Sequence, residues 1–206
     1  MAVIGGLLFL ALAYFAFGQA AVTRSGAQTA ADAAALAAAQ DARDQLRDRW
    51  LDVLSDPGQW EALFEGKGFV EAEACERAAA FAARNGADLL GDGCTRLNSE
   101  DVGFKVTVRS VDAVGRSVIP ITESQHAVAT AEAVIVPRCT FDAPLEPSED
   151  PGPTPGEGEE TPEEPEEPEE SEPIVGLVCG DVSWVIDPED PVLPDAADLF
   201  RVRLID

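Results

Sequence analysis

The chain has 206 residues, of which 39 are acidic and 14 are basic, and its formal net charge is −25. This charge argues against nucleic-acid binding, because phosphate contacts need clusters of lysine and arginine. With an apolar N-terminal run and an acidic tract set aside, about 120 to 150 residues remain, enough for one small domain.

The chain opens with an apolar run. Residues 2–17 carry no polar side-chain group except the Tyr14 hydroxyl, and the next five residues add only Gln19. At 1.5 Å rise per residue, a helix of about twenty residues spans roughly 30 Å, the thickness of a bilayer core. We therefore predict a transmembrane helix over residues 1–22, in contact with membrane lipid.

Two other interpretations of this run stay open. Cleavage of a signal peptide near Gln19 would release a secreted protein, although the basic region of a signal peptide is missing. A buried core helix of a soluble protein would need more covering sequence than the chain provides. No lysine or arginine precedes the run, so the positive-inside rule gives no orientation.

An alanine-rich helix is expected to continue to about Leu54, where Ser55-Asp56-Pro57-Gly58 ends it. A capping-box pattern at Ser25 predicts a break or a bend just outside the lipid. Further along, aspartates follow one side of the helix and Leu46 and Trp50 follow the other. This amphipathic pattern predicts that the later part of the helix packs on a domain.

Between residues 27 and 42 the helix is rich in alanine, which makes up ten of the sixteen residues. Small side chains allow other helices to approach closely, but alanine is also the best helix former, and both accounts stay open. The candidate helix-packing residues are Gly18, Ala27, Ala30, Asp32, Ala34 and Ala38.

A second helix is predicted over residues 69–85, with Gly86 as its left-handed C-cap. The apolar pattern then alternates as in strands. The predicted strands are residues 102–109, 127–136, 174–178, 182–186 and 199–205. Helices followed by a run of strands indicate an α+β fold with a small antiparallel sheet, partly crossed by the long helix.

Residues 144–173 hold thirteen of the acidic residues and nine of the fifteen prolines, without lysine or arginine. Such a composition predicts a disordered insertion. It divides an extracytoplasmic domain of residues 23–143 from C-terminal strands in residues 174–206 that complete the domain.

Four cysteines are present: Cys75, Cys94, Cys139 and Cys179. They form no closely spaced pair, which disfavours zinc, and an even number in an exported segment predicts two disulfides. Of the three possible connectivities we favour the sequential one, first with second and third with fourth. Disulfides persist on the oxidising side of a membrane, so the amino terminus is expected inside and the domain outside.

Residues 28–39 read QTAADAAALAAA and follow directly on the apolar run. This combination resembles the TadE/TadG-like proteins of the Tad (tight adherence, Flp-type) pilus system. Residues 74–87 and Cys94 are similar to the ectodomain of actinobacterial members. The resemblance is specific over about residues 7–42, and it makes Asp32 a motif position.

The resemblance implies a single-pass, pilin-like envelope protein, either a pseudopilin or an assembly factor, without catalysis. Its partners would be other pilin-like or pilus assembly proteins, bound through the N-terminal helix. Pseudopilins of this kind carry a basic leader, whereas the apolar residues here begin at position 2. Either the true reading frame starts earlier, or the chain is inserted without processing.

The residues also argue against an enzyme. His126 is the only histidine, and it belongs to no recognisable nucleophile–base set. A disordered glutamate-rich tract cannot hold two carboxyl groups at a catalytic separation. We predict a non-enzymatic chain without cofactor or metal. The alternative functions are a signal-anchored envelope binding module, in which the helix is only a tether, and a secreted protein.

Overall fold

The computed structural model describes residues 2–97, 101–113, 124–141, 173–187 and 192–205. The helices are α1 (Ala2–Asp52), α2 (Trp60–Phe64), α3 (Glu71–Arg84) and α4 (Ala196–Leu199), with a 3₁₀ turn at Pro57–Gln59. The strands are β1 (Ala87–Arg96), β2 (Val102–Ala113), β3 (His126–Pro137), β4 (Cys139–Phe141), β5 (Ile174–Cys179), β6 (Val182–Ile186) and β7 (Phe200–Ile205). These elements confirm the predicted α+β class.

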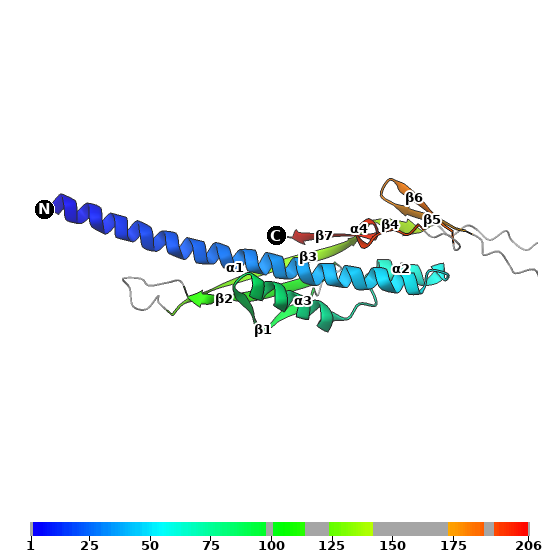
Figure 1. Cartoon of the computed structure of the whole chain (residues 1–206), viewed down its shortest axis with the longest axis horizontal. Coiled ribbons are helices and arrows are strands. Elements are labelled where there is room, and N and C mark those ends of the chain that lie inside the picture. Colours follow the sequence, from blue (N-terminus) through cyan, green and yellow to red (C-terminus); the bar gives the residue numbers. More distant parts are fainter. Residues whose placement is uncertain (1, 98–100, 114–123, 142–172, 188–191, 206) are drawn as a thin grey trace, which may run out of the picture.

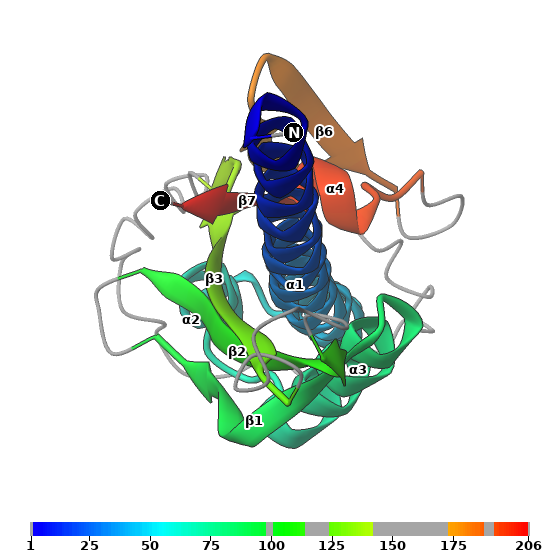
Figure 2. The same ribbon diagram turned by 90° about the vertical axis from the view of Figure 1, so that its left-hand side faces the viewer.

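Helix α1 is the axis of the molecule. It runs for 51 residues, and its N-terminal part projects beyond every other labelled element (Figure 1). Viewed along its length, the later part of α1 lies in the hollow of a curled sheet, with α3 beside it (Figure 2). The helix ends at Asp52, shortly before Pro57, whose ring cannot continue a helix.

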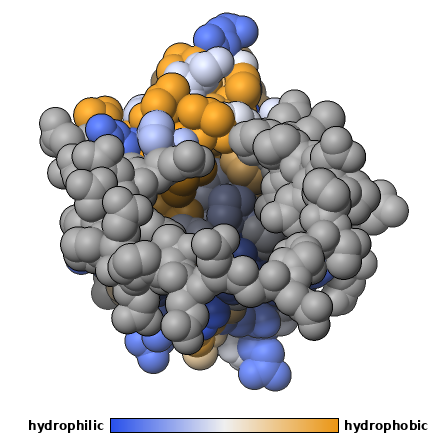
Figure 3. Space-filling view, turned by 90° about the vertical axis from the view of Figure 1, so that its right-hand side faces the viewer, coloured by the Kyte–Doolittle hydropathy of each residue, from blue (hydrophilic) through white to orange (hydrophobic). Residues whose placement is uncertain are grey.

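The main sheet has the strand order β1-β2-β3-β7, and every neighbouring pair is antiparallel. A second sheet, β4-β5-β6, continues from the end of β3 and lies at the end of the molecule opposite the amino terminus (Figure 1). That end carries an apolar surface near β6 (Figure 3), where the exposed residues include Val182 and Val185.

An aromatic cluster closes the core where α1 ends. The Trp50 and Trp60 ring centroids are 5.2 Å apart, and Trp60 lies 4.6 Å from the ring of Phe141 in β4. Trp60 Nε1 donates a hydrogen bond of 3.1 Å to the carbonyl oxygen of Val53. The cluster therefore ties the end of α1 to the second sheet.

One glycine is required by strand packing. Gly103 of β2 is opposite Val134 of β3, and a Cβ atom at Gly103 would lie only 2.1 Å from the carbonyl oxygen of Ala133. That contact is with backbone, which cannot move aside as a flexible side chain can. Glycine at this position therefore allows β2 and β3 to pair.

Two predictions about these elements need correction. Among the described residues no helix is long and apolar enough to cross a membrane, so the transmembrane helix predicted for residues 1–22 is wrong. Weakly hydrophobic alanine and glycine make up much of that stretch. The break predicted at Ser25 is also wrong, because α1 is one helix through this residue. The Thr29 hydroxyl donates a hydrogen bond to the Ser25 carbonyl oxygen within the helix.

Strand β1 was not predicted. Its register with β2 shifts between Leu89 and Cys94, so a bulge interrupts the alternation of apolar and polar residues. The insertion predicted for residues 144–173 lies outside the described residues except at its last position.

Both predicted disulfides are confirmed. Cys75–Cys94 joins α3 to β1, and Cys139–Cys179 joins the first residue of β4 to the last residue of β5. The second bond spans 40 residues and lies at a paired position of the β4–β5 ladder. The ladder itself therefore holds the two cysteines together.

Deletion of residues 146–172 is expected to leave the fold and both disulfides intact. The pairing of Cys139 with Cys179 and of Phe141 with Leu177 does not involve the deleted residues. The shorter loop should reduce the stabilisation from the second disulfide by only about 1 kcal/mol. Mass spectrometry under non-reducing conditions and thermal unfolding measure the outcome. Free thiols in the shortened chain would contradict the prediction, and Cys179→Ala is the control that must break the bond.

Candidate functional site: the two halves of helix α1

The later half of α1 is buried on two sides by small residues. Nine alanines between positions 27 and 42 are buried, and seven of them have no exposed surface. On one side they meet α3, whose own buried residues are Ala74, Ala78 and Ala82. On the other side they meet β3, whose residues Ala129, Ala131 and Ala133 belong to the same core. Alanine on both surfaces allows the helix to lie close to each neighbour.

A glutamine side chain fixes the start of α3 on α1. The Gln45 amide oxygen accepts a hydrogen bond of 2.7 Å from the backbone N–H of Val70, which is the N-cap residue of α3. The Gln45 amide nitrogen donates to Asp41 one turn earlier, at 2.7 Å. Gln45 therefore positions α3 along α1 through a polar contact that the apolar pattern alone would not reveal.

The six residues predicted to pack helices fall into two groups in the structure. Ala27, Ala30, Ala34 and Ala38 are buried within the chain itself. The other two are not part of this buried surface. Asp32 is half-buried and accepts a hydrogen bond of 2.8 Å from Gln28, and Gly18 is exposed on the projecting part of the helix. Of the six, only Gly18 is fully available to a second protein.

The projecting half of α1 is apolar and uncovered. A weak hydrogen bond of 3.4 Å from Gln28 to the carbonyl oxygen of Thr130 lies near the point where α1 leaves the sheet. Before residue 23, the large apolar side chains that the structure describes are between 57 and 84 % exposed: Val3, Ile4, Leu7, Leu8, Phe9, Leu10, Leu12, Tyr14, Phe15 and Val22. No residue before Arg24 carries a charge on its side chain. Contiguous apolar surface of this extent marks an interaction site.

One face of this half is indented. A surface hollow of about 810 Å³ follows Leu10, Tyr14, Gly18 and Ala21, with Ala11 and Ala13 beside them. These positions recur every three or four residues and therefore share a face of the helix. Gly18 leaves space between the larger side chains, so a partner helix could approach the backbone there.

His126 takes part in local structure. Its Nδ1 atom lies 2.8 Å from the carbonyl oxygen of Ser110, across the paired strands β2 and β3. The Ser110 hydroxyl accepts a hydrogen bond from the backbone N–H of Ala127 and donates one to the carbonyl oxygen of Asp112. These contacts join the ends of β2 and β3. The absence of enzymatic activity stays a prediction.

The fold defines a protein whose single long helix serves as both the core of a small α+β domain and an apolar projection. The Tad family model, which describes Flp pilus-assembly TadE/G-like proteins, matches residues 1–41. The resemblance to this family is thereby confirmed for the N-terminal helix, and the actinobacterial type stays a prediction. No curated protein and no solved structure matches the chain.

Substitution of Ala34 by leucine is expected to destabilise the domain by about 1–3 kcal/mol, because the added atoms overfill a close-packed interface. The same substitution at Ala21, which is exposed on the projecting half, should change stability little. Urea unfolding followed by circular dichroism measures both variants. Equal stability of the two variants would show that the alanine interface is not closely packed.

Proposed function

We propose that this chain is a non-catalytic component of a Tad pilus assembly in the cell envelope, and that it joins other pilus proteins through the projecting half of α1. The observation that carries the proposal is the exposed apolar surface formed by the described large side chains from Val3 to Val22. This apolar surface lies on the same uninterrupted helix whose later half is buried in the folded domain. The family match supports the proposal because it covers the projection and most of its anchor.

The size of the exposed surface makes helix packing favourable. Full burial of one large apolar side chain contributes roughly 1.5–3 kcal/mol. Among the described residues of the projection, ten such side chains are exposed. Even partial burial of this set would offset the roughly 4–15 kcal/mol that association costs in lost translational and rotational freedom.

Cell fractionation tests where the chain acts. Intact cells are sheared, the sheared, envelope and culture fractions are blotted, and the N-terminus of the recovered protein is read. Chain in the sheared fraction indicates a filament subunit, and chain confined to the envelope indicates an assembly factor. A shortened form found only in the medium, without residues 3–17, would contradict the proposal.

Substitution of Gly18 by leucine should reduce the assembled fraction by about tenfold or more without destabilising the domain. A Cβ atom at Gly18 meets no other atom within 4 Å, so the folded chain has room for the side chain. The loss is expected because leucine would fill the hollow and hold a partner helix away, at a cost of about 1–3 kcal/mol. The assembled fraction is measured by chemical crosslinking in cells.

The matched control is Gly26→Leu. Gly26 lies on the same helix and also has no atom within 4 Å of its Cβ position, but it is not part of the hollow. If both variants assemble normally, α1 serves as a tether and the packing proposal fails. If both lose assembly equally, the hollow at Gly18 has no special role.

A further inference from the structure

A second hollow, of about 580 Å³, lies beside the hollow at Gly18, at the point where α1 leaves the sheet. Its walls come from α1 and from β3, which contributes Val128, Ala129 and Thr130. We call it the collar hollow. Ala21 lines both hollows, so they adjoin each other along α1.

One row of α1 residues runs through both hollows. Six of the lining residues are spaced alternately by three and by four positions: Ala11, Tyr14, Gly18, Ala21, Ser25 and Gln28. This spacing is the repeat with which two helices pack along a common seam in a coiled coil. A single partner helix can therefore follow this row from the projection to the collar hollow.

Arg24 flanks this row inside the collar hollow. If Gly18 and Ser25 are at position a of a heptad abcdefg, Arg24 is at position g, where residues form ion pairs between helices. Arg24 is exposed and is the first charged side chain of the sequence. No acidic side chain is among the described residues that line the collar hollow.

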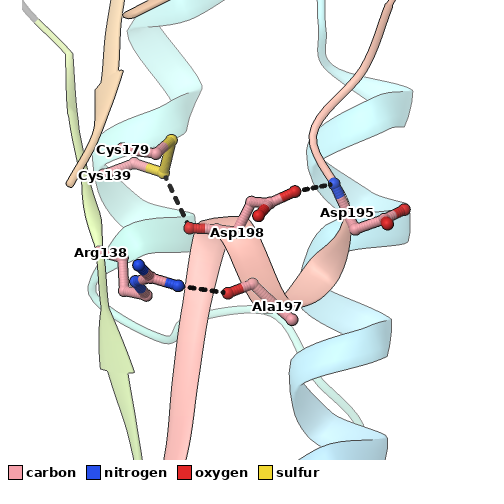
Figure 4. Close-up of a disulfide and its surroundings, with 6 residues drawn as sticks. All are labelled: Arg138, Cys139, Cys179, Asp195, Ala197 and Asp198. Carbon is pink, nitrogen blue, oxygen red and sulfur yellow. Dashed lines mark hydrogen bonds between the residues drawn. A yellow bond between two sulfur atoms is a disulfide. The ribbon is translucent and has the colours of Figure 1, made fainter. Parts of the chain in front are cut away.

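The charge of Arg24 is not engaged within the folded chain. No hydrogen bond or ion pair of its side chain is observed among the described residues. Arg138 shows the contrast, because its guanidinium donates a hydrogen bond of 3.1 Å to the carbonyl oxygen of Ala197 (Figure 4). The Arg24 guanidinium is therefore available to a carboxylate of a partner, to which it can donate paired hydrogen bonds.

A second copy of this chain does not supply that carboxylate. In a parallel pair in register, a residue at g faces the next e residue of the other helix, which here is Thr29. Thr29 is uncharged, and its hydroxyl donates a hydrogen bond of 3.0 Å to Ser25 within its own helix. Two chains with a net charge of −25 each would also repel one another. The occupant that fits is a helix of a different protein.

We propose that the two hollows hold one helix of another pilus protein, and that a carboxylate of this helix pairs with Arg24 where the helix reaches the collar hollow. The inference rests on the proposed function, because it names the partner of the same apolar surface. The apolar row supplies contact area. Charge pairs beside a helical seam determine which partner binds and in which orientation. Arg24 is therefore the residue that selects an acidic partner helix.

Carbodiimide crosslinking of isolated cell envelopes tests this pairing. The reagent joins an amine to a carboxylate when the two groups are in direct contact. Arg24→Lys keeps the charge and places an amine in the collar hollow, whereas the chain's own lysines are Lys67 and Lys105. Mass spectrometry of this variant should show position 24 joined to an aspartate or glutamate of another protein, close to the end of an apolar run.

Charge reversal measures how much the pairing contributes. Arg24→Glu should lower the assembled fraction by about fivefold or more, because a repulsion replaces an attraction. The matched control is Arg203→Glu, which is exposed and pairs with Val134 of β3, outside the lining of the collar hollow. The control should change the assembled fraction by less than about twofold, because a distant charge is screened by salt.

Three results would overturn the inference. They are normal assembly of Arg24→Glu, a loss equal to that of Arg203→Glu, and adducts that join only two copies of this chain. Loss of assembly in Arg24→Glu without an adduct in Arg24→Lys would also overturn it, because the anion would not be a carboxylate.

Gly18→Leu distinguishes failure of this inference from failure of the proposed function. If Gly18→Leu loses assembly while Arg24→Glu assembles normally, helix packing stands and the acidic partner is wrong. If both variants assemble normally, both proposals fail.

Discussion

The close approach of α1 to two neighbours at once is the constraint on which the rest of the structure depends. Alanines of α1 meet alanines of α3 on one side and alanines of β3 on the other. Interiors are close-packed, so a larger side chain on any of the three surfaces would separate the layers. The helix fills the hollow of the main sheet, and its buried residues belong to one core cluster with residues of both sheets.

An alanine core buries little apolar area per residue, and the disulfides compensate for this. α3 and the main sheet lie on different sides of α1 and meet through β1. Gly86 turns the chain from α3 into β1 with a φ of 71°, which glycine adopts without steric cost. Cys75–Cys94 joins the same two elements covalently, so the layers around α1 are linked where they meet.

The sequence predicted elements whose signals are local. The boundaries of α3, the left-handed Gly86 and most strands follow from periodicity and from single residues. The bulge at Leu89–Cys94 concealed β1, because alternation fails where the register shifts. The sequence pattern also identified the alanine-rich segment of residues 27–42. It did not show that the sheet of the same chain covers this segment. The contact of Gln45 with the start of α3 could not be predicted, because Gln45 and Val70 meet only through the fold.

The continuity of α1 couples its two ends mechanically. Gly18 of the projecting half and Arg43 of the later half are on one uninterrupted helix, about 35–40 Å apart along the axis. No proline lies within α1, and the helix is uninterrupted through Ser25 and Gly26. A partner that packs on the projection is therefore joined to the folded domain by one uninterrupted helix.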